Sequence, residues 1–389
     1  MRPVSFSPNN HITLLHSGAA FFPALIAAID GAHDEIYLET YIFAADETAM
    51  QVQQALAGAE QRGVKVRIIS DWLGTGRQRC MALSQEFQAA AVMYRAFNPW
   101  FGRGVARMHR KMCVVDRQTG FVGGLNIIDD MISDDDQRQP LPAARWDFAV
   151  SISGPLVATI HLELEEQWLR LSDMKLMARF QQFRRSRSRI SAPGASQGAA
   201  LAGLVLRDNL RNRRTIQRAY LQALGRARQS ALLTSPYFAP GRKLRRALEE
   251  AAKRGVDVIL LLGVGHYRLH DAVSHAYYPQ LLKAGVRIVE YRKTALHAKV
   301  AVIDENWATV GSSNFDGLSL LVNQEANVVI DDAEFSRALR QQIQIGIADG
   351  VEVAARTFAN LPWLSRVWYR TAFLLYRMLM WIIAIDNRE

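Results

Sequence analysis

The stretch MHRKMCVVD, residues 108–116, places His109 and Lys111 two residues apart in an otherwise apolar segment. Successive side chains of a β-strand point to opposite faces, so a strand here would project His109 and Lys111 side by side. Its apolar residues would anchor the other face. A histidine and a lysine accommodated in a protein core would explain one such stretch, but the sequence contains the pattern twice.

The second copy lies nearly 190 residues later and keeps every interval between its polar residues. The first copy reads HRKMCVVDRQTGFVGGLN (109–126) and the second reads HAKVAVIDENWATVGSSN (297–314). Chance is a poor explanation for two such patterns, so we interpret them as two parts of one site. The candidate residues are His109, Lys111, Asp116 and Asn126 in the first copy, and His297, Lys299, Asp304 and Asn314 in the second.

Longer repeats around the two copies predict the fold class. Three pairs of segments match: 37–46 with 231–240, 59–71 with 251–263, and 82–97 with 278–291. The last two pairs each join helical to strand-like sequence. Strands that alternate with helices indicate an α/β fold. We therefore expect two duplicated α-β-α sandwich domains related by a pseudo-twofold axis, with the site at their interface.

The expected domain boundaries follow changes in composition. We assign 1–175 to the first domain, 176–203 to a linker, 204–350 to the second domain and 351–389 to a C-terminal segment. The linker is basic and then rich in Pro, Gly and Ser, which is typical of a flexible connector. Its charge fits equally a solvated linker and a segment attracted to the phosphates of lipids or nucleic acid.

Composition restricts the possible partners and compartment. The 389-residue chain is 49% hydrophobic and carries a formal net charge of +10, which favours an anionic partner such as nucleic acid, acidic lipid or a phosphorylated substrate. Its two cysteines, Cys80 and Cys113, do not predict a disulfide framework and fit a reducing compartment. We expect no signal peptide, and the apolar run 18–32 fits a core helix better than a membrane span.

The duplicated H-x-K-x4-D pattern, followed by G-[GS]-x-N, resembles the phospholipase D superfamily over roughly residues 10–170 and 205–335. The order of segments is most similar to its bacterial cardiolipin synthase branch, of the type without N-terminal transmembrane helices. The resemblance implies a phosphatidyltransferase that needs no cofactor or metal. It also implies a phosphohistidine intermediate, with His109 as the nucleophile.

The residue types suit this chemistry. One imidazole can attack phosphorus, and a second, His297, can protonate the leaving oxygen and then deprotonate the incoming hydroxyl. Lysine and asparagine side chains can stabilise the charge on the phosphate oxygens. By resemblance, Glu325 would reach across the interface to His109 and Asp147 to His297. Asp116 and Asp304 belong to the signature, but we expect a structural role for them.

Two other clusters invite a metal hypothesis, which we set aside. The aspartates at 129, 130, 134, 135 and 136 lack the glycine and ligand alternation of a calcium loop, so we expect a solvated loop near the site. His266, His270 and His275 lack the spacing of a zinc motif, and we place them at the rim of the pocket.

The choice between lipid and nucleic acid depends on the C-terminal segment. Residues 361–385 are apolar at nearly every position except the arginines and are rich in Trp, which predicts a helix lying in a membrane interface; a core helix is the alternative. We therefore expect transfer of a phosphatidyl group to phosphatidylglycerol. The donor stays open between phosphatidylglycerol and phosphatidylethanolamine. The expected location is peripheral, at the cytoplasmic face of a bacterial inner membrane. The alternatives are a phospholipid hydrolase, a phosphodiesterase acting on nucleic acid, and a non-catalytic membrane-binding protein.

Overall fold

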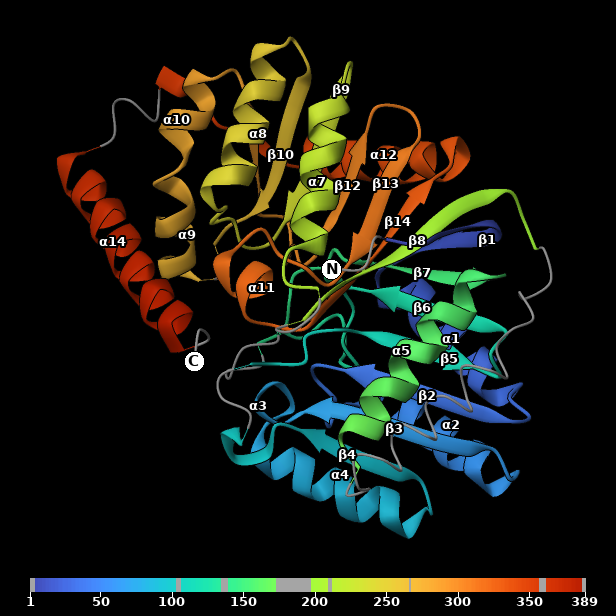
Figure 1. The fold of residues 1–389 in the computed structure, drawn as a ribbon. Coiled ribbons are helices and arrows are strands. Elements are labelled where there is room, and N and C mark those ends of the chain that lie inside the picture. Colours follow the sequence, from blue (N-terminus) through green and yellow to red (C-terminus); the bar gives the residue numbers. More distant parts are fainter. Residues whose placement is uncertain are drawn as a thin grey trace.

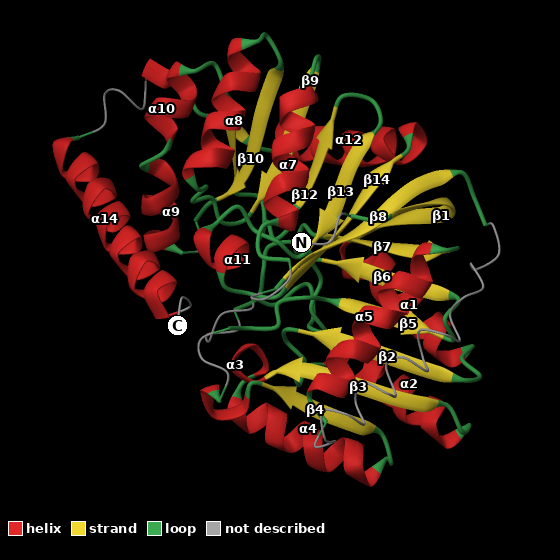
Figure 2. Cartoon of the chain, viewed as in Figure 1, coloured by secondary structure: helices red, strands yellow, loops and turns green. Residues whose placement is uncertain are grey.

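The computed structural model describes residues 4–102, 106–133, 139–172, 197–208, 212–265, 267–356 and 362–386. The described residues form two α/β halves, coloured blue to green and yellow to red in Figure 1. In Figure 2 helices flank the strands of each half.

The first half contains the elements of residues 6–170. Its strands are β1 (Phe6–His16), β2 (Glu35–Thr40), β3 (Lys65–Asp71), β4 (Met93–Phe97), β5 (Met112–Val115), β6 (Thr119–Gly123) and β7 (Phe148–Ser153). Its helices are α1 (Ser17–Asp30), α2 (Glu47–Gln61), α3 (Trp72–Thr75), α4 (Arg77–Ala89) and α5 (Leu156–Arg170), with a 3-10 turn at Pro99–Phe101.

The second half follows the same plan and ends in a separate helix. Its strands are β8 (Ala200–Arg207), β9 (Ser230–Ser235), β10 (Asp257–Gly263), β11 (Arg287–Tyr291), β12 (Val300–Ile303), β13 (Trp307–Gly311), β14 (Glu325–Asp331) and β15 (Val351–Glu352). Its helices are α7 (Thr215–Arg226), α8 (Arg242–Lys253), α9 (Arg268–His275), α10 (Tyr278–Lys283), α11 (Gly317–Leu321), α12 (Ala333–Ala348) and α14 (Trp363–Asp386).

Strand order is the same in the two halves. The first half has the order β1-β7-β6-β5-β2-β3-β4, and the second has β8-β14-β13-β12-β9-β10-β11, with β15 added at the edge. The equivalent strands β1 and β8 pair antiparallel where the halves meet, with Phe6 opposite Gly203. Antiparallel pairing of equivalent strands is what a twofold axis between them produces. The expected α/β fold with a duplicated unit is thus confirmed.

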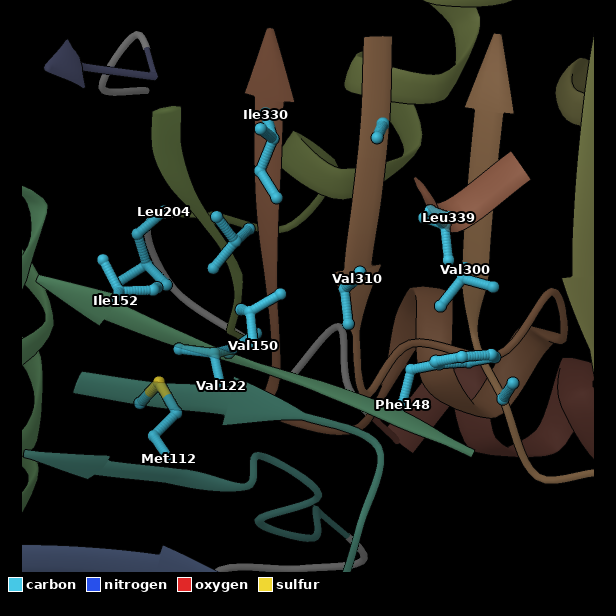
Figure 3. Packing of buried hydrophobic residues seen from close by; sticks show 14 of the residues in the cluster. Met112, Val122, Phe148, Val150, Ile152, Leu204, Val300, Val310, Ile330 and Leu339 are labelled. Atoms are coloured by element: carbon cyan, nitrogen blue, oxygen red, sulfur yellow. The ribbon is translucent and has the colours of Figure 1, made fainter. Parts of the chain in front are cut away.

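The buried hydrophobic residues form three clusters, one on the outer face of each half and one between the halves. One cluster packs α1, α2 and α4 against the outer face of the first half, and another packs α7 to α10 against the outer face of the second. The third cluster lies between the halves and includes α5 and α12. Figure 3 shows part of this cluster, with Phe148 and Val150 from the first half near Val300 and Val310 from the second. The halves therefore share one core.

Two details of the structure differ from the sequence-based expectation. Of the expected linker 176–203, residues 176–196 are not among the described residues. Its last residues already belong to β8, which begins at Ala200 and pairs with β1 and β14. The repeat 37–46 with 231–240 is also shifted by one position. The Thr40 hydroxyl donates to Ile42 O as the Ser235 hydroxyl donates to Tyr237 O, so Ser235, and not Thr234, is the counterpart of Thr40.

Candidate active site

His109 lies where the two halves meet. β5 begins only at Met112, so His109 and Lys111 are on the extended approach to that strand and not within it. The backbone N–H of His109 donates to Gln324 O of the second half at 2.9 Å. The N–H of His297 likewise donates to Trp146 O of the first half at 2.9 Å. Each histidine is thereby fixed by backbone from the opposite half.

The carboxylate partners of the histidines are exchanged between the halves. His109 Nδ1 lies 3.0 Å from Glu325 Oε2, and His297 Nδ1 lies 2.6 Å from Asp147 Oδ2. Glu325 opens β14, and Asp147 directly precedes the equivalent strand β7. A carboxylate on Nδ1 fixes the tautomer and leaves Nε2 for chemistry. The structure thus brings together the four residues that the sequence paired by resemblance.

The motif residues after Gly123 and Gly311 fit the two carboxylates differently. A Cβ at Gly124 would lie 2.3 Å from Asp147 Oδ1, so only glycine leaves room for that carboxylate. Its counterpart Ser312 donates its hydroxyl to Glu325 Oε2 at 2.5 Å. The second position of the G-[GS] pair, Gly124 or Ser312, therefore differs between the halves according to the carboxylate that lies beside it.

Both motif lysines are buried and turn back toward the histidines. Lys111 Nζ donates to His109 O at 2.7 Å, and Lys299 Nζ donates to His297 O. Burial lowers the pKa of Lys111 to about 7, and the nearby Lys299 acts in the same direction. Because Lys299 of the second motif affects the titration of Lys111 in the first, the two motifs form one electrostatic site.

The titration of the other groups suits a neutral nucleophile and ionised supports. Burial lowers the pKa of His109, opposed by Glu325 and reinforced by Lys111. Burial acts to raise the pKa of Glu325, but His109 and Lys111 outweigh it, so the pKa lies below its usual value. The pKa of Asp147 is also lowered, because Lys299 and His297 outweigh the effect of burial. His109 thus keeps Nε2 unprotonated, while the Glu325 carboxylate on Nδ1 can stabilise a positive ring.

The two motif asparagines are buried in the loops that follow β6 and β13. Asn126 Oδ1 accepts the N–H of Ile42 at 3.2 Å. Asn314 Oδ1 is buried and has no hydrogen-bond partner within the described part of the chain. An amide oxygen in that state can accept a hydrogen bond from a substrate hydroxyl, whereas a phosphate oxygen would need the Nδ2 group as its donor.

Asp116 and Asp304 lie at the other end of their strands from the histidines. Asp116 accepts the backbone N–H groups of residues 33, 34 and 35, at 2.8 to 2.9 Å. Asp304 accepts those of residues 228, 229 and 230, at 2.8 to 3.2 Å. Both carboxylates therefore tie the start of a parallel strand to the motif strand beside it. The structural role expected for them agrees with this geometry.

Sequence reasoning missed Tyr41, which lies directly beside the site. Its ring centroid is 4.8 Å from that of His109 and 5.1 Å from Lys111 Nζ. Tyr41 follows β2, and no motif marks it; only its position after a strand that pairs with the motif strand could have indicated it. Its ring shields one side of the candidate nucleophile.

Of the histidines expected at the rim of the pocket, one lies near the site and another does not. His270 packs against Tyr237, with centroids 4.6 Å apart, and Tyr237 lines a hollow that also includes His297. His275 is not at that rim: its Nε2 lies 2.7 Å from Glu290 Oε1, and its ring lies 5.0 Å from that of Tyr369 in α14. His266 and the aspartates at 134 to 136 lie outside the described residues. A wider hollow of about 1000 Å³ lies beside Asp304, at the end of β12 away from the histidines.

The fold of this chain is similar to that of a protein of known structure. The crystal structure of phosphatidylserine synthase from Haemophilus influenzae matches with a TM-score of 0.69 over 96% of this chain and 93% of that one, at 14% sequence identity. At this identity the likeness concerns the fold alone. The chain is a phospholipase D-like protein, since the family model "Cardiolipin synthase, PLD-like domain" matches its residues 25–136 and 220–345.

Relatives by sequence narrow the class. Cardiolipin synthase B of Escherichia coli is 37% identical over 377 residues, which are 94% of this chain and 86% of that protein. The probable cardiolipin synthase YwiE of Bacillus subtilis is 28% identical over 350 residues, covering 88% and 67% of the two chains. The chain therefore belongs to the cardiolipin synthase family of phospholipase D-like enzymes.

Proposed function

We propose that this protein is a phosphatidyltransferase of the cardiolipin synthase type, which moves a phosphatidyl group from one phospholipid to phosphatidylglycerol. The observation that supports this most directly is the exchange of carboxylates, Glu325 to His109 and Asp147 to His297. Two oriented imidazoles in one buried, cationic site suit two successive displacements at one phosphorus. The proposal assigns to this chain the activity for which the relatives are named.

In the first displacement, Nε2 of His109 attacks the phosphorus of the donor lipid. The bond between phosphorus and the headgroup oxygen breaks, and the N–P bond of a phosphohistidine forms. The leaving oxygen takes a proton from His297, so the headgroup departs as a neutral alcohol. Lys111 and Lys299 offset the charge on the non-bridging oxygens, while Glu325 supports the positive ring of His109.

The second displacement reverses these steps with another alcohol. His297 accepts the proton of a headgroup hydroxyl of phosphatidylglycerol, whose oxygen then attacks phosphorus. The N–P bond breaks and His109 is restored as a neutral imidazole. With phosphatidylglycerol as donor as well, two molecules give one cardiolipin and one glycerol.

The proposed location is peripheral, on the cytoplasmic face of the inner membrane. Along α14 several large apolar side chains are exposed, for example Trp363 at 70%, Leu364 at 62% and Leu374 at 62%. Arg370 and Arg377 are also exposed on this helix. Exposed Trp and Leu with arginines are typical of a helix in a membrane interface. Among the described helices, none combines the length and the apolar character needed to span a bilayer.

The test uses purified protein, EDTA and vesicles of phosphatidylglycerol, with the products identified by mass spectrometry. Cardiolipin and glycerol in equal amounts are expected. Phosphatidic acid in place of cardiolipin would mean hydrolysis, and cardiolipin formed only after addition of phosphatidylethanolamine would identify the donor. Absence of lipid turnover, together with cleavage of single-stranded or duplex DNA, would overturn the proposal.

A further inference from the structure

The loops that follow the two motif asparagines are held by different partners. Three residues after Asn126, the N–H of Asp129 donates to Asp46 Oδ2 at 3.1 Å. Three residues after Asn314, the N–H of Gly317 donates to the hydroxyl oxygen of Tyr376 at 2.7 Å. Asp46 belongs to the same half as its loop, whereas Tyr376 is on α14, which has no counterpart among the described elements of the first half.

The repeat shows which acceptor the second half lacks. Bridges between Phe43 and Ile127 and between Phe238 and Phe315 align the loops of the two halves. On this alignment the counterpart of Asp46 is Gly241, and each of them is the N-cap residue of the next helix, α2 or α8. Glycine has no side chain, so residue 241 cannot accept the N–H of Gly317.

α14 is fitted closely to this loop. A Cβ at Gly317 would lie 2.7 Å from Met380 Cε and 2.9 Å from the Tyr376 hydroxyl, so a side chain at 317 would displace the ends of these two α14 side chains. Ala372 of α14 is fully buried, and Phe373 packs on Tyr277 with centroids 5.3 Å apart. In Figure 1 α14 lies beside α9, with α11 close by.

The same loop continues directly into the candidate active site. Ser312, at its beginning, holds Glu325, and Asn314 precedes Phe315, whose N–H donates to Ser235 Oγ at 3.2 Å. A fixed Gly317 therefore limits the positions that the Asn314 side chain can take. In the first half, Asp46 does the same for Asn126.

We propose that Tyr376 is a positioning residue: through it, α14 supplies the hydrogen-bond acceptor that Gly241 cannot, and so orders the loop that presents Asn314 to the phosphate. Seating of α14 against α9 and α11 then becomes a condition for full turnover. The inference rests on the proposed function for its kinetic readout.

The test compares Tyr376→Phe, Gly241→Asp and the double variant on a soluble p-nitrophenyl phosphodiester. Tyr376→Phe removes only the acceptor, and we expect kcat to fall about tenfold with little change in KM. The double variant should recover most of this loss. An aspartate fits at 241, where φ is −63° and the Cβ would have only Gln217 Nε2 within 4 Å, at 3.9 Å.

Two controls separate positioning from stability. Aspartate at 241 would also cap α8, as Asp46 caps α2, and so stabilise the protein by itself. Gly241→Ser in the Tyr376→Phe background should cap α8 without reaching Gly317, and kcat should stay low. Leu375→Ser, an exposed change on the same helix, should leave kcat on the soluble substrate unchanged.

Hydrogen exchange of the peptide 312–321 gives a readout that does not depend on turnover. We expect faster exchange in Tyr376→Phe and restored protection in the double variant with aspartate. Unchanged exchange and kcat in Tyr376→Phe, or equal recovery with serine and aspartate, would overturn the inference. If exchange responds as expected while the wild-type protein turns over no phosphodiester, the proposed function fails and the positioning role stands.

Discussion

At the scale of single residues, the site depends on the state in which each buried group is held. His109 needs an unprotonated Nε2 to attack phosphorus, and burial lowers its pKa from the usual 6.5. Lys111 needs its proton to offset phosphate charge, and burial lowers its pKa to about 7. The two requirements overlap only in a limited range of pH.

The first prediction is therefore a bell-shaped dependence of kcat/KM on pH for a soluble phosphodiester. The rate should rise as pH increases through the lowered pKa of His109, below 6.5, and fall as Lys111 loses its proton near pH 7. Arginine keeps its charge at these pH values, so Lys111→Arg should move the falling limb to higher pH in whatever activity remains. A falling limb at the same pH in both proteins would assign it to another group.

The second prediction separates the two histidines by pre-steady-state kinetics. With a p-nitrophenyl phosphodiester the leaving group needs no proton, so His297→Ala should still release one equivalent of nitrophenol in a burst and then stall. His109→Ala should show no burst, and both should lose at least about 10²-fold in steady-state turnover. A burst retained in His109→Ala and absent from His297→Ala would reverse the two roles.

Sequence alone identified the histidines, lysines and asparagines, because their spacing repeats. It gave the partners Glu325 and Asp147 only by resemblance, since they lie 216 and 150 residues from their histidines. Tyr41 and Tyr376 carry no motif. Their roles arise from packing between elements that are distant in the chain, and no local pattern records such contacts.

At the scale of elements, the motif aspartates show how a conspicuous residue can serve the scaffold. Asp116 and Asp304 each accept three backbone N–H groups, from the first residue of β2 or β9 and the two residues before it. Those strands pair with β5 and β12, whose approaches carry the histidines. The aspartates thus set the register between the motif strand and its neighbour.

The third prediction follows from the loss of these hydrogen bonds. Asp116→Ala and Asp304→Ala should each lower the free energy of unfolding by about 1–3 kcal/mol, because the N–H groups lose their acceptor. Urea denaturation measures this. Asp34→Ala, in the turn that Asp116 binds, should change stability by no more than about 0.5 kcal/mol. Large losses of turnover in the folded aspartate variants, with stability unchanged, would contradict the structural role.

Most elements could be predicted from periodicity, but their registers could not. The apolar run 18–32 forms α1 and the C-terminal segment forms α14, as expected. The one-residue shift between the repeats at β2 and β9 went unseen, because Thr234 matches Thr40 in type while Ser235 matches it in position. The register is set by the turn that follows each strand. There the hydroxyl of either a threonine or a serine can donate to the carbonyl oxygen two residues later.

At the scale of the whole molecule, α14 lies along one side of the second half (Figure 1). Seven of its large apolar side chains are exposed in the described chain, among them Trp363, Leu364 and Leu374. An exposed stripe of this kind is costly in water unless a partner covers it. The proposed lipid substrate makes a bilayer the natural partner.

The fourth prediction concerns this surface. Leu364→Ser combined with Leu374→Ser should weaken binding to anionic vesicles at least about tenfold, because two apolar side chains no longer enter the interface. Turnover of a soluble phosphodiester should not change. Ile345→Ser on α12, where the side chain is 53% exposed, is the matched control and should bind as the wild type does. Equal binding by all three proteins would show that α14 does not contact lipid.

The repeat predicted the whole-molecule arrangement in outline. It indicated a duplicated α/β unit with a shared site, but the joining of the halves through β1 and β8 was not visible in the sequence. Strand pairing at that seam depends on which edges remain open after each half has formed, and the motifs carry no information about edges.

The exchange of carboxylates also has a consequence for biosynthesis. A nascent chain carries His109 long before the ribosome reaches Glu325, and it carries Asp147 long before His297. Until the second half has been translated and has folded, His109 lacks its acid, Asp147 lacks its imidazole, and no phosphate can be held between two histidines. The growing polypeptide is therefore chemically silent toward the lipids around it, and activity begins only after Glu325 has been translated and its strand has folded.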